Sequence, residues 1–353
     1  MIKVLIVEDS TVAREFLTYV LTSDPAIQVI GTANNGVEAL EFLEHKKPDV
    51  ITMDIHMPIM DGFEATRRIM ETVPTPIVIV SGSTGSTEVA STFRAIEAGA
   101  LAIVRRPPGI NHQEFEEASQ EIIRTVRLMS EIRVVRRIPR TAATRIPEYS
   151  PPVSGFKAKG TIQVVAVGAS TGGPPVLKQI LSGLLQNLPV PILIVQHIAD
   201  GFSKGLVDWL GGTSGLPVHI ASHGEVPLPG HAYFPPDGFH LGVGNGPCII
   251  LDDGAPENGL RPSVAYLFRS VSQTFGPGAI GVLLTGMGKD GAEELKLLRD
   301  RGAITIAQDE ASSVVYGMPG EAVKLGATGH VLPPEGIVAT ILAALGRDGK
   351  RGL

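Results

Sequence analysis

The chain of 353 residues has a single cysteine, few aromatic residues and no long apolar stretch. Because Cys248 is alone, an intrachain disulfide is excluded, and this cysteine usage fits a reducing compartment. No uninterrupted apolar run approaches the roughly 20 residues of a membrane helix. The first apolar run stops at Glu8-Asp9, which is too short for the core of a signal peptide. We therefore expect a cytoplasmic protein that is not inserted in a membrane.

A basic excess is also missing, because the formal net charge is −6. Nucleic acid and anionic membranes are therefore not expected as main partners. Aromatic residues make up only 5% of the chain, whereas glycine (41) and proline (27) are frequent. This balance favours an α/β protein with aliphatic strands and many tight turns. The length favours two domains of ordinary size.

Within residues 1–125, short aliphatic runs alternate with amphipathic stretches of helical period, such as Val12/Phe16/Val20. The alternation predicts a doubly wound domain, with a parallel sheet covered by helices on both faces. A site is then expected in the crevice outside the carboxyl ends of the strands. The expected strands lie at Val4–Val7, Val29–Ile30, Val50–Met53, Ile77–Val80 and Ala102–Val104.

Residues 126–160 break this pattern, because arginines crowd together and are followed by prolines and a glycine. They predict a flexible, basic linker. Contact of these arginines with nucleic acid is the alternative, but no DNA-reading helix accompanies them.

A second α/β pattern covers residues 161–346, and residues 347–353 are expected to form a disordered tail. A loop-rich stretch at 211–262 is expected to contain a hairpin. The expected buried strands lie at Ile162–Val167, Ile192–Val195, Ala279–Leu284 and Ile304–Ala307.

Acidic and hydroxyl side chains end three of the strands expected in the first half. Glu8 and Asp9 end the first strand, Asp54 the third and Ser81 the fourth. At one edge of a parallel sheet, the three carboxylates would repel one another unless a cation held them. Oxygen ligands suit Mg²⁺, and a carboxylate beside Mg²⁺ can attack a phosphoryl group. Each residue alone is as easily a helix cap, but together they predict a phosphorylation site.

The motifs around these residues resemble the two-component receiver family across about residues 1–120. They are Glu8-Asp9, Met53-Asp54-Ile-His-Met-Pro-Ile-Met-Asp-Gly62 and Val80-Ser81. The resemblance implies a flavodoxin-like receiver domain with Asp54 as the phospho-acceptor. It also implies that Mg²⁺ is held by Glu8, Asp9, Asp54 and the main-chain carbonyl of His56, and that Ser81 couples phosphorylation to loop movement.

Arg106 is a departure from the receiver pattern, because the family has a lysine before a proline where this chain has Val104-Arg-Arg-Pro107. Arginine keeps the charge but is bulkier and forked, so the exchange is not conservative at a phosphate site. Phosphoryl binding is expected to survive, while the strength of the transmitted signal is open.

Ser170 lies in Gly168-Ala-Ser-Thr-Gly172, which fits the G-x-S-x-G pattern between a strand and a helix. Small neighbours permit a sharp turn that exposes the serine hydroxyl near the positive end of the helix. The same turn could instead cradle the phosphate of a nucleotide. By itself the motif is compatible with both a nucleophilic serine and a nucleotide-binding turn, although the Lys-Ser/Thr that follows a P-loop glycine is missing.

A base and an orienting acid are available in the same half of the chain. His197 ends the next expected strand, and Asp290 follows another. With Ser170, they would meet at the carboxyl edge of one parallel sheet, and geometry rather than sequence order defines a triad. The order Ser, His, Asp differs from that of α/β-hydrolases. Five other histidines are more easily surface or structural residues: His219, His223, His231, His240 and His330.

Taken together, the motifs resemble the chemotaxis protein-glutamate methylesterase family over nearly the whole chain. In order, they are Gly168-Ala-Ser-Thr-Gly-Gly173, Val195-Gln-His-Ile198, Leu228-Pro-Gly-His-Ala-Tyr233, Arg261-Pro-Ser-Val264, Leu284-Thr-Gly-Met-Gly-Lys-Asp-Gly291 and Ala307-Gln-Asp-Glu-Ala-Ser-Ser-Val-Val-Tyr-Gly-Met-Pro319. The resemblance implies a Rossmann-like esterase domain. In it Ser170 is the nucleophile, His197 the general base and acid, and Asp290 the orienting carboxylate. The main-chain N–H of Met287, with help near Thr171, would stabilise the oxyanion.

The same resemblance implies the reaction and its control. The enzyme would hydrolyse glutamate γ-methyl esters on methyl-accepting chemoreceptors and also deamidate receptor glutamines, with no cofactor in the catalytic domain. A chemotaxis histidine kinase would phosphorylate Asp54 and so relieve inhibition by the receiver domain. The alternatives are a response regulator with a nucleotide- or DNA-binding output, and a scaffold without activity. Against these, residues 160–345 lack a basic recognition helix, and all three triad positions are filled.

Overall fold

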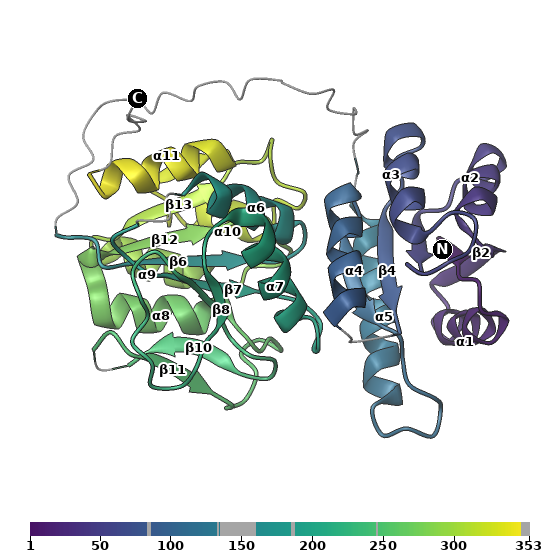
Figure 1. Cartoon of the computed structure of the whole chain (residues 1–353), viewed down its shortest axis with the longest axis horizontal. Coiled ribbons are helices and arrows are strands. Elements are labelled where there is room, and N and C mark those ends of the chain that lie inside the picture. The colour runs from purple at the N-terminus through teal and green to yellow at the C-terminus, as the bar shows by residue number, and fades with distance from the viewer. Residues whose placement is uncertain (83–85, 133, 135–159, 185–187, 245, 347–353) are drawn as a thin grey trace. The chain divides into compact units, whose positions relative to one another are not determined.

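The computed structural model divides the chain into two compact units, Met1–Arg145 and Ile146–Leu353 (Figure 1). It describes all residues except 83–85, 133, 135–159, 185–187, 245 and 347–353. Most of the expected linker at 126–160, and the whole expected tail, lie outside the described residues. The two units are therefore described separately. Among the described residues, no helix combines the length and the apolarity needed to cross a membrane.

The first unit is a five-stranded parallel sheet flanked by helices, and it confirms the predicted doubly wound class. The strand order is β2-β1-β3-β4-β5. The strands are β1 (Ile2–Val7), β2 (Ile27–Ala33), β3 (Val50–Met53), β4 (Ile77–Ser81) and β5 (Ala102–Arg105). The helices are α1 (Thr11–Thr22), α2 (Gly36–His45), α3 (Gly62–Thr72), α4 (Ser86–Ala98) and α5 (Phe115–Ser130).

Side-chain burial explains this arrangement and corrects two details of the expectation. Strands β3 and β4 are buried along their whole length, as expected for a sheet covered on both faces. The buried stripe of α1 contains Leu17, Val20 and Leu21, whereas Val12 is 78% exposed, because Val12 lies outside that stripe. Helix α5 continues past residue 125 and buries Val126 and Met129, so the first unit extends beyond the expected boundary.

The second unit contains a seven-stranded sheet in the order β14-β13-β12-β6-β7-β9-β8, and its strand pairs are all parallel. Its strands are β6 (Val164–Ala169), β7 (Ile192–Gln196), β8 (Val218–Ile220), β9 (Ala232–Phe234), β12 (Ala279–Leu283), β13 (Ile304–Gln308) and β14 (His330–Leu332). The expected hairpin is the antiparallel pair β10 (His240–Val243) and β11 (Ile249–Asp252).

Helices pack in two groups on this sheet. Helix α6 contacts α7 and α11, while α9 contacts α8 and α10 (Figure 1). The helices are α6 (Gly173–Gly183), α7 (Ser203–Ser214), α8 (Val264–Phe275), α9 (Ala292–Asp300), α10 (Met318–Lys324) and α11 (Pro334–Ala344), with a short 3₁₀ turn η1 (Gly276–Gly278).

The central strand β6 has β7 on one side and β12 on the other, although β12 comes much later in the chain. The strand order therefore reverses at β6, and ligands of open α/β sheets bind at the carboxyl ends of strands around such a point. Ser170 follows β6, His197 follows β7, and Asp290 lies in the segment after β12. The topology thus brings all three predicted catalytic residues to one edge of the sheet.

Candidate functional site

The turn around Ser170 is sharp because glycines occupy the positions where side chains would collide. Gly172 has a φ of +79°, and a Cβ there would lie 2.5 Å from Val314. A Cβ at Gly173 would lie 2.1 Å from Oε1 of Gln196. The chain therefore passes from β6 into α6 within a few residues, and the half-buried Ser170 lies just before the helix begins. This is the strand-to-helix turn that the G-x-S-x-G spacing predicts.

His197 and Asp290 form a direct hydrogen bond. Nε2 of His197 lies 2.9 Å from Oδ2 of Asp290, although 93 residues separate the two in sequence. The main-chain N–H of His197 also donates to the carbonyl of Ala169 at 2.9 Å, which ties the histidine to the end of β6. Both side chains are largely buried, with 11% of His197 and 3% of Asp290 exposed.

The start of helix α8 holds the Asp290 carboxylate. One carboxylate oxygen accepts from Val264 N at 2.6 Å, and the other accepts from the Ser263 hydroxyl at 2.9 Å and from Ala265 N at 3.1 Å. Ser263 is also the N-cap of α8. Burial opposes ionisation, but the hydrogen bond and charge of His197 and the two N–H groups outweigh it and lower the pKa of Asp290. Asp290 therefore remains a carboxylate despite its burial.

Gly286 brings the segment after β12 against Ser170. A Cβ on Gly286 would lie 2.7 Å from the Ser170 Cβ and 2.4 Å from the Met318 sulfur, so only glycine permits this approach. The main-chain N–H of Ser170 donates to the Thr285 carbonyl at 3.0 Å. Within the described part of the chain, neither Thr171 N nor Met287 N donates to a protein acceptor. The two predicted oxyanion donors thus each keep a main-chain N–H that no described protein group uses.

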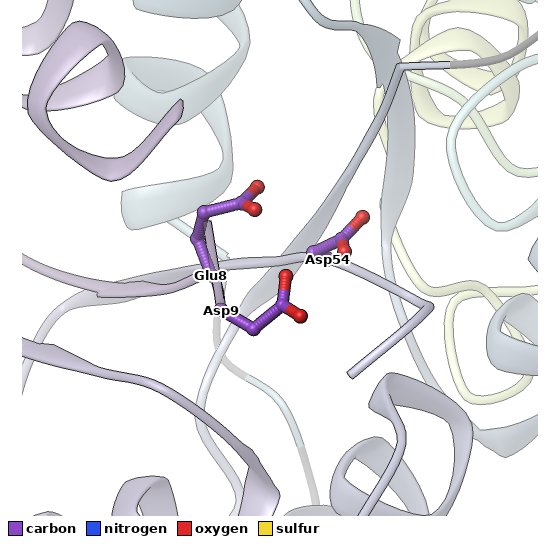
Figure 2. A group of neighbouring side chains, drawn as sticks. All are labelled: Glu8, Asp9 and Asp54. Atoms are coloured by element: carbon purple, nitrogen blue, oxygen red, sulfur yellow. The ribbon is translucent and has the colours of Figure 1, made fainter. Parts of the chain in front are cut away.

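The first unit gathers the three predicted carboxylates, Glu8, Asp9 and Asp54 (Figure 2). One oxygen from each lies within 4.8 Å of the others, and Glu8 is buried while Asp9 is exposed. Glu8 and Asp9 follow β1, and Asp54 follows the neighbouring strand β3. The donor set consists of carboxylate oxygens only and opens to solvent on the Asp9 side, which fits Mg²⁺.

The electrostatics of this cluster are unfavourable for three bare carboxylates. Burial and the charge of Asp54 raise the pKa of Glu8 to about 7. Burial also raises the pKa of Asp54, although the Arg106 charge offsets part of the effect. Such raised pKa values indicate a site that gains from a bound cation.

Arg106 supplies a positive charge at the cluster. One guanidinium nitrogen, Nη2, donates to Glu8 at 2.6 Å and lies 3.5 Å from Asp54. The Arg106 main chain donates to the carbonyl of Ser81 at 2.7 Å, so both predicted switch residues lie at the same edge of the sheet. The Ser81 side chain is buried, and His56 is exposed two residues after Asp54.

Comparisons with known proteins agree with both halves of this geometry. Residues 165–341 match the CheB methylesterase family, and residues 4–116 match the response regulator receiver domain. A protein-glutamate methylesterase/protein-glutamine glutaminase of Nitrosospira multiformis is 54% identical over 100% of this chain and 99% of its own length. The chain belongs to the CheB methylesterase family.

Two further members of the CheB family extend the comparison. A protein-glutamate methylesterase/protein-glutamine glutaminase of Syntrophus aciditrophicus is 56% identical and covers 98% of this chain and 99% of its own. The crystal structure of the Thermotoga maritima CheB methylesterase catalytic domain is 36% identical, with a TM-score of 0.50, and covers 52% of this chain and 99% of its own. The predicted family is thereby confirmed.

The geometry of the CheB site also has features that the sequence motifs do not reveal. Among the described residues, no hydrogen bond joins Ser170 to His197, and such bonds often tighten only when substrate is present. The hydrogen bond that the Ser263 hydroxyl donates to Asp290 was not predicted, although Ser263 lies in the motif Arg261-Pro-Ser-Val264. His240 is buried, accepts from Ser263 N and lies 3.3 Å from the Ala255 carbonyl, so it supports the same turn.

Proposed function

We propose that this chain hydrolyses glutamate γ-methyl esters on chemoreceptors and releases methanol. The observation that carries the proposal is the buried His197–Asp290 pair at the sheet edge where the Ser170 turn ends, in a member of the CheB methylesterase family. A nucleotide-binding output is less well supported, because the glycine turn packs against protein atoms of Val314 and Gln196. An inactive scaffold is also less well supported, because a buried, ionised carboxylate such as Asp290 is typical of a functional site.

The orientation of the imidazole defines the proton path in this proposal. The ionised Asp290 can only accept, so Nε2 of His197 carries the hydrogen of their bond. Nδ1 is then the unprotonated nitrogen that takes the proton from the Ser170 hydroxyl as its oxygen attacks the ester carbon. Asp290 stabilises the imidazolium that forms.

The remaining steps follow from the same groups. The N–H groups of Thr171 and Met287 stabilise the tetrahedral oxyanion. His197 returns its proton to the leaving methoxide, which departs as methanol and leaves an acyl-enzyme on Ser170. His197 then deprotonates a water, which frees the glutamate carboxylate and restores the Ser170 hydroxyl. A receptor glutamine would form the same acyl-enzyme and release ammonia, which fits the glutaminase named in both relatives.

The first unit would control this reaction through Asp54. A chemotaxis histidine kinase is the proposed phosphodonor, and the receiver match over residues 4–116 supports it. Glu8, Asp9, Asp54 and the His56 carbonyl would hold Mg²⁺, which neutralises phosphoryl charge when bound. Arg106 and Ser81 would contact the phosphoryl oxygens. Without phosphorylation, the receiver domain inhibits the catalytic domain.

Replacement of the nucleophile tests the core of the proposal. Ser170→Ala should lower methanol release from methylated receptor by roughly 10³-fold or more, because the covalent route is lost. Phosphorylation of Asp54 by a small phosphodonor should remain at the wild-type level in the same variant, which shows that the receiver unit is intact. Wild-type methanol release by Ser170→Ala would contradict the proposed function.

A further inference from the structure

Gln196 is a buried side chain that the proposed mechanism does not use, although it directly precedes His197. It is the last residue of β7 and is 4% exposed. Its Nε2 donates to the carbonyl of Ser170 at 2.9 Å and to the carbonyl of His197 at 2.8 Å. A single amide group thus joins the two turns that carry the proposed nucleophile and the proposed base.

The orientation of this amide leaves its oxygen without a partner. Both neighbours of Nε2 are carbonyl oxygens, which only accept, so the reversed amide would set oxygen against oxygen. Oε1 of Gln196 is therefore buried with no hydrogen-bond partner among the residues that the structure describes. A buried acceptor without a partner has lost its hydrogen bonds to water and gained none, which is unfavourable. Such a cost beside the reacting groups suggests a role in the site rather than in stability.

The Ser170 carbonyl is held by two donors, Gln196 Nε2 and the main-chain N–H of Gly173 at 2.8 Å. Both lone pairs of this oxygen are thereby used. The peptide unit between Ser170 and Thr171 is planar and trans, so its N–H points away from its carbonyl. Holding the carbonyl therefore aims the Thr171 N–H, which is one of the two proposed oxyanion donors.

His197 is anchored from both sides of its main chain. Its N–H donates to Ala169, the last residue of β6, and its carbonyl accepts from Gln196. Ala169 and Gln196 are also direct partners in the parallel ladder of β6 and β7. The main chains of Ser170 and His197 are thus fixed to the same pair of strand ends.

We infer that Gln196 is a positioning residue for the reaction. It sets the separation of the Ser170 and His197 main chains and aims the Thr171 N–H at the developing oxyanion. The inference rests on the proposed esterase function. It concerns the transition state rather than substrate binding, so it predicts an effect on kcat with little effect on KM.

Gln196→Met tests this role, because methionine keeps the length and volume of the side chain but donates no hydrogen bond. We expect kcat for methanol release to fall roughly 10- to 100-fold, as small displacements of reacting groups do, while KM stays within about twofold. Trp209 is the only tryptophan of the chain and is buried in α7, so its fluorescence reports the folding of the catalytic unit. The unfolding midpoint measured in this way should stay close to wild type.

Gln196→Glu supplies a second readout that a packing role would not move. At low pH the introduced carboxyl is protonated and keeps one donor for one carbonyl. As the pH rises it ionises and sets a charge against two carbonyl oxygens. The ratio of variant to wild-type kcat should therefore fall with rising pH, whereas the ratio for Gln196→Met should not change with pH.

Ser272→Ala is the matched control, since Ser272 Oγ is another buried atom without a partner among the described residues. It should keep wild-type kcat at every pH. Wild-type kcat in Gln196→Met, or equal pH dependence of both Gln196 variants with a lowered unfolding midpoint, would overturn the inference. A wild-type chain that releases no methanol would instead contradict the proposed function, and the inference would fall with it.

Discussion

Two buried carboxyl groups of this protein, Asp290 and Glu8, have opposite pKa shifts. Burial alone would raise both values. Asp290 receives hydrogen bonds from His197, Ser263 and two main-chain N–H groups at the start of α8, and its pKa is lowered. Glu8 faces the charge of Asp54, and Arg106 and the Ser10 N–H compensate only in part, so its pKa rises to about 7. The donors around Asp290 outweigh its burial, whereas the charge of Asp54 adds to the burial of Glu8, and the two pKa values therefore shift in opposite directions.

The raised pKa of Glu8 predicts how the receiver unit responds to pH without Mg²⁺. Between pH 4.5 and about 7, the folded state binds a proton that the unfolded state releases, so stability falls as pH rises. The effect is on the order of 3 kcal/mol. Hydrogen exchange of β1 peptides, corrected for intrinsic rates, should show less protection at pH 8 than at pH 6.

Glu8→Gln is the control for this measurement, because it keeps the shape of the side chain without the charge. The variant should lose the pH dependence of β1 protection and be more protected than wild type at pH 8. Equal pH dependence in wild type and Glu8→Gln would show that another group is responsible.

At the scale of elements, helix α8 connects stability with the proposed chemistry. Its first turn points N–H groups at Asp290, and the positive end of a helix favours a carboxylate there. Its N-cap, Ser263, bonds the carboxylate directly, and the buried His240 accepts from the Ser263 main chain. The orienting acid of the proposed triad is therefore held by a helix whose N-cap lies 27 residues earlier in the sequence.

Ser263→Ala should impair both properties of this helix. The lost cap should cost about 1 kcal/mol of unfolding free energy. Loss of a hydrogen bond to a charged group, about 1.5 kcal/mol or more, should lower kcat for methanol release roughly tenfold. Chemical denaturation followed by Trp209 fluorescence, together with methanol release, measures the two effects.

Asn35→Ala provides the matched control, since Asn35 caps α2 in the receiver unit by accepting from two main-chain N–H groups. It should cost similar stability in its own unit and leave methanol release unchanged. If Ser263→Ala retained wild-type kcat, the hold of α8 on Asp290 would be structural only.

At the scale of the whole molecule, the chain joins a proposed phosphorylation site and a proposed esterase site in separate units. If the receiver unit inhibits the catalytic unit, the inhibited state needs to be more stable than the active state by only a few kcal/mol. Phosphorylation of one aspartate can reverse a preference of this size. Arg106 stands where the receiver family has a lysine, at a position expected to contact the phosphoryl group, so this exchange bears on how phosphorylation is transmitted.

A small phosphodonor with Mg²⁺ should therefore raise methanol release at least tenfold, since inhibited states of this kind leave roughly 0.1–10% of molecules active. Asp54→Asn should keep the basal rate and lose the response to the donor. If methanol release by the wild-type chain did not respond to the donor, the proposed esterase function would stand, but its control by the receiver unit would be contradicted. In that case Arg106→Lys would show whether the arginine prevents coupling.

Much of the fold could be predicted because apolar periodicity is a local property. The strands around Val50–Met53 and Ile192–Gln196 are continuous apolar runs, and the structure has them where expected. The edge strand β14 was not predicted, and β8 lies in the stretch at 211–262 where short strands are expected without bounds, because three residues carry little pattern. For helices, apolar residues with helical spacing do not by themselves identify the buried face, because Val12 has this spacing and is exposed.

The family, the two α/β units and the strand ends at which Ser170, His197 and Asp290 lie all follow from the amino-acid sequence, since they depend on neighbouring residues and motifs. Which atoms meet is instead set by the three-dimensional packing of the chain. It turned Nε2 of His197 toward Asp290, and it brought Gln196 against the carbonyl of Ser170, which lies 26 residues earlier in the sequence. Such contacts depend on strand order and on the packing of distant segments, which no local pattern of residues encodes.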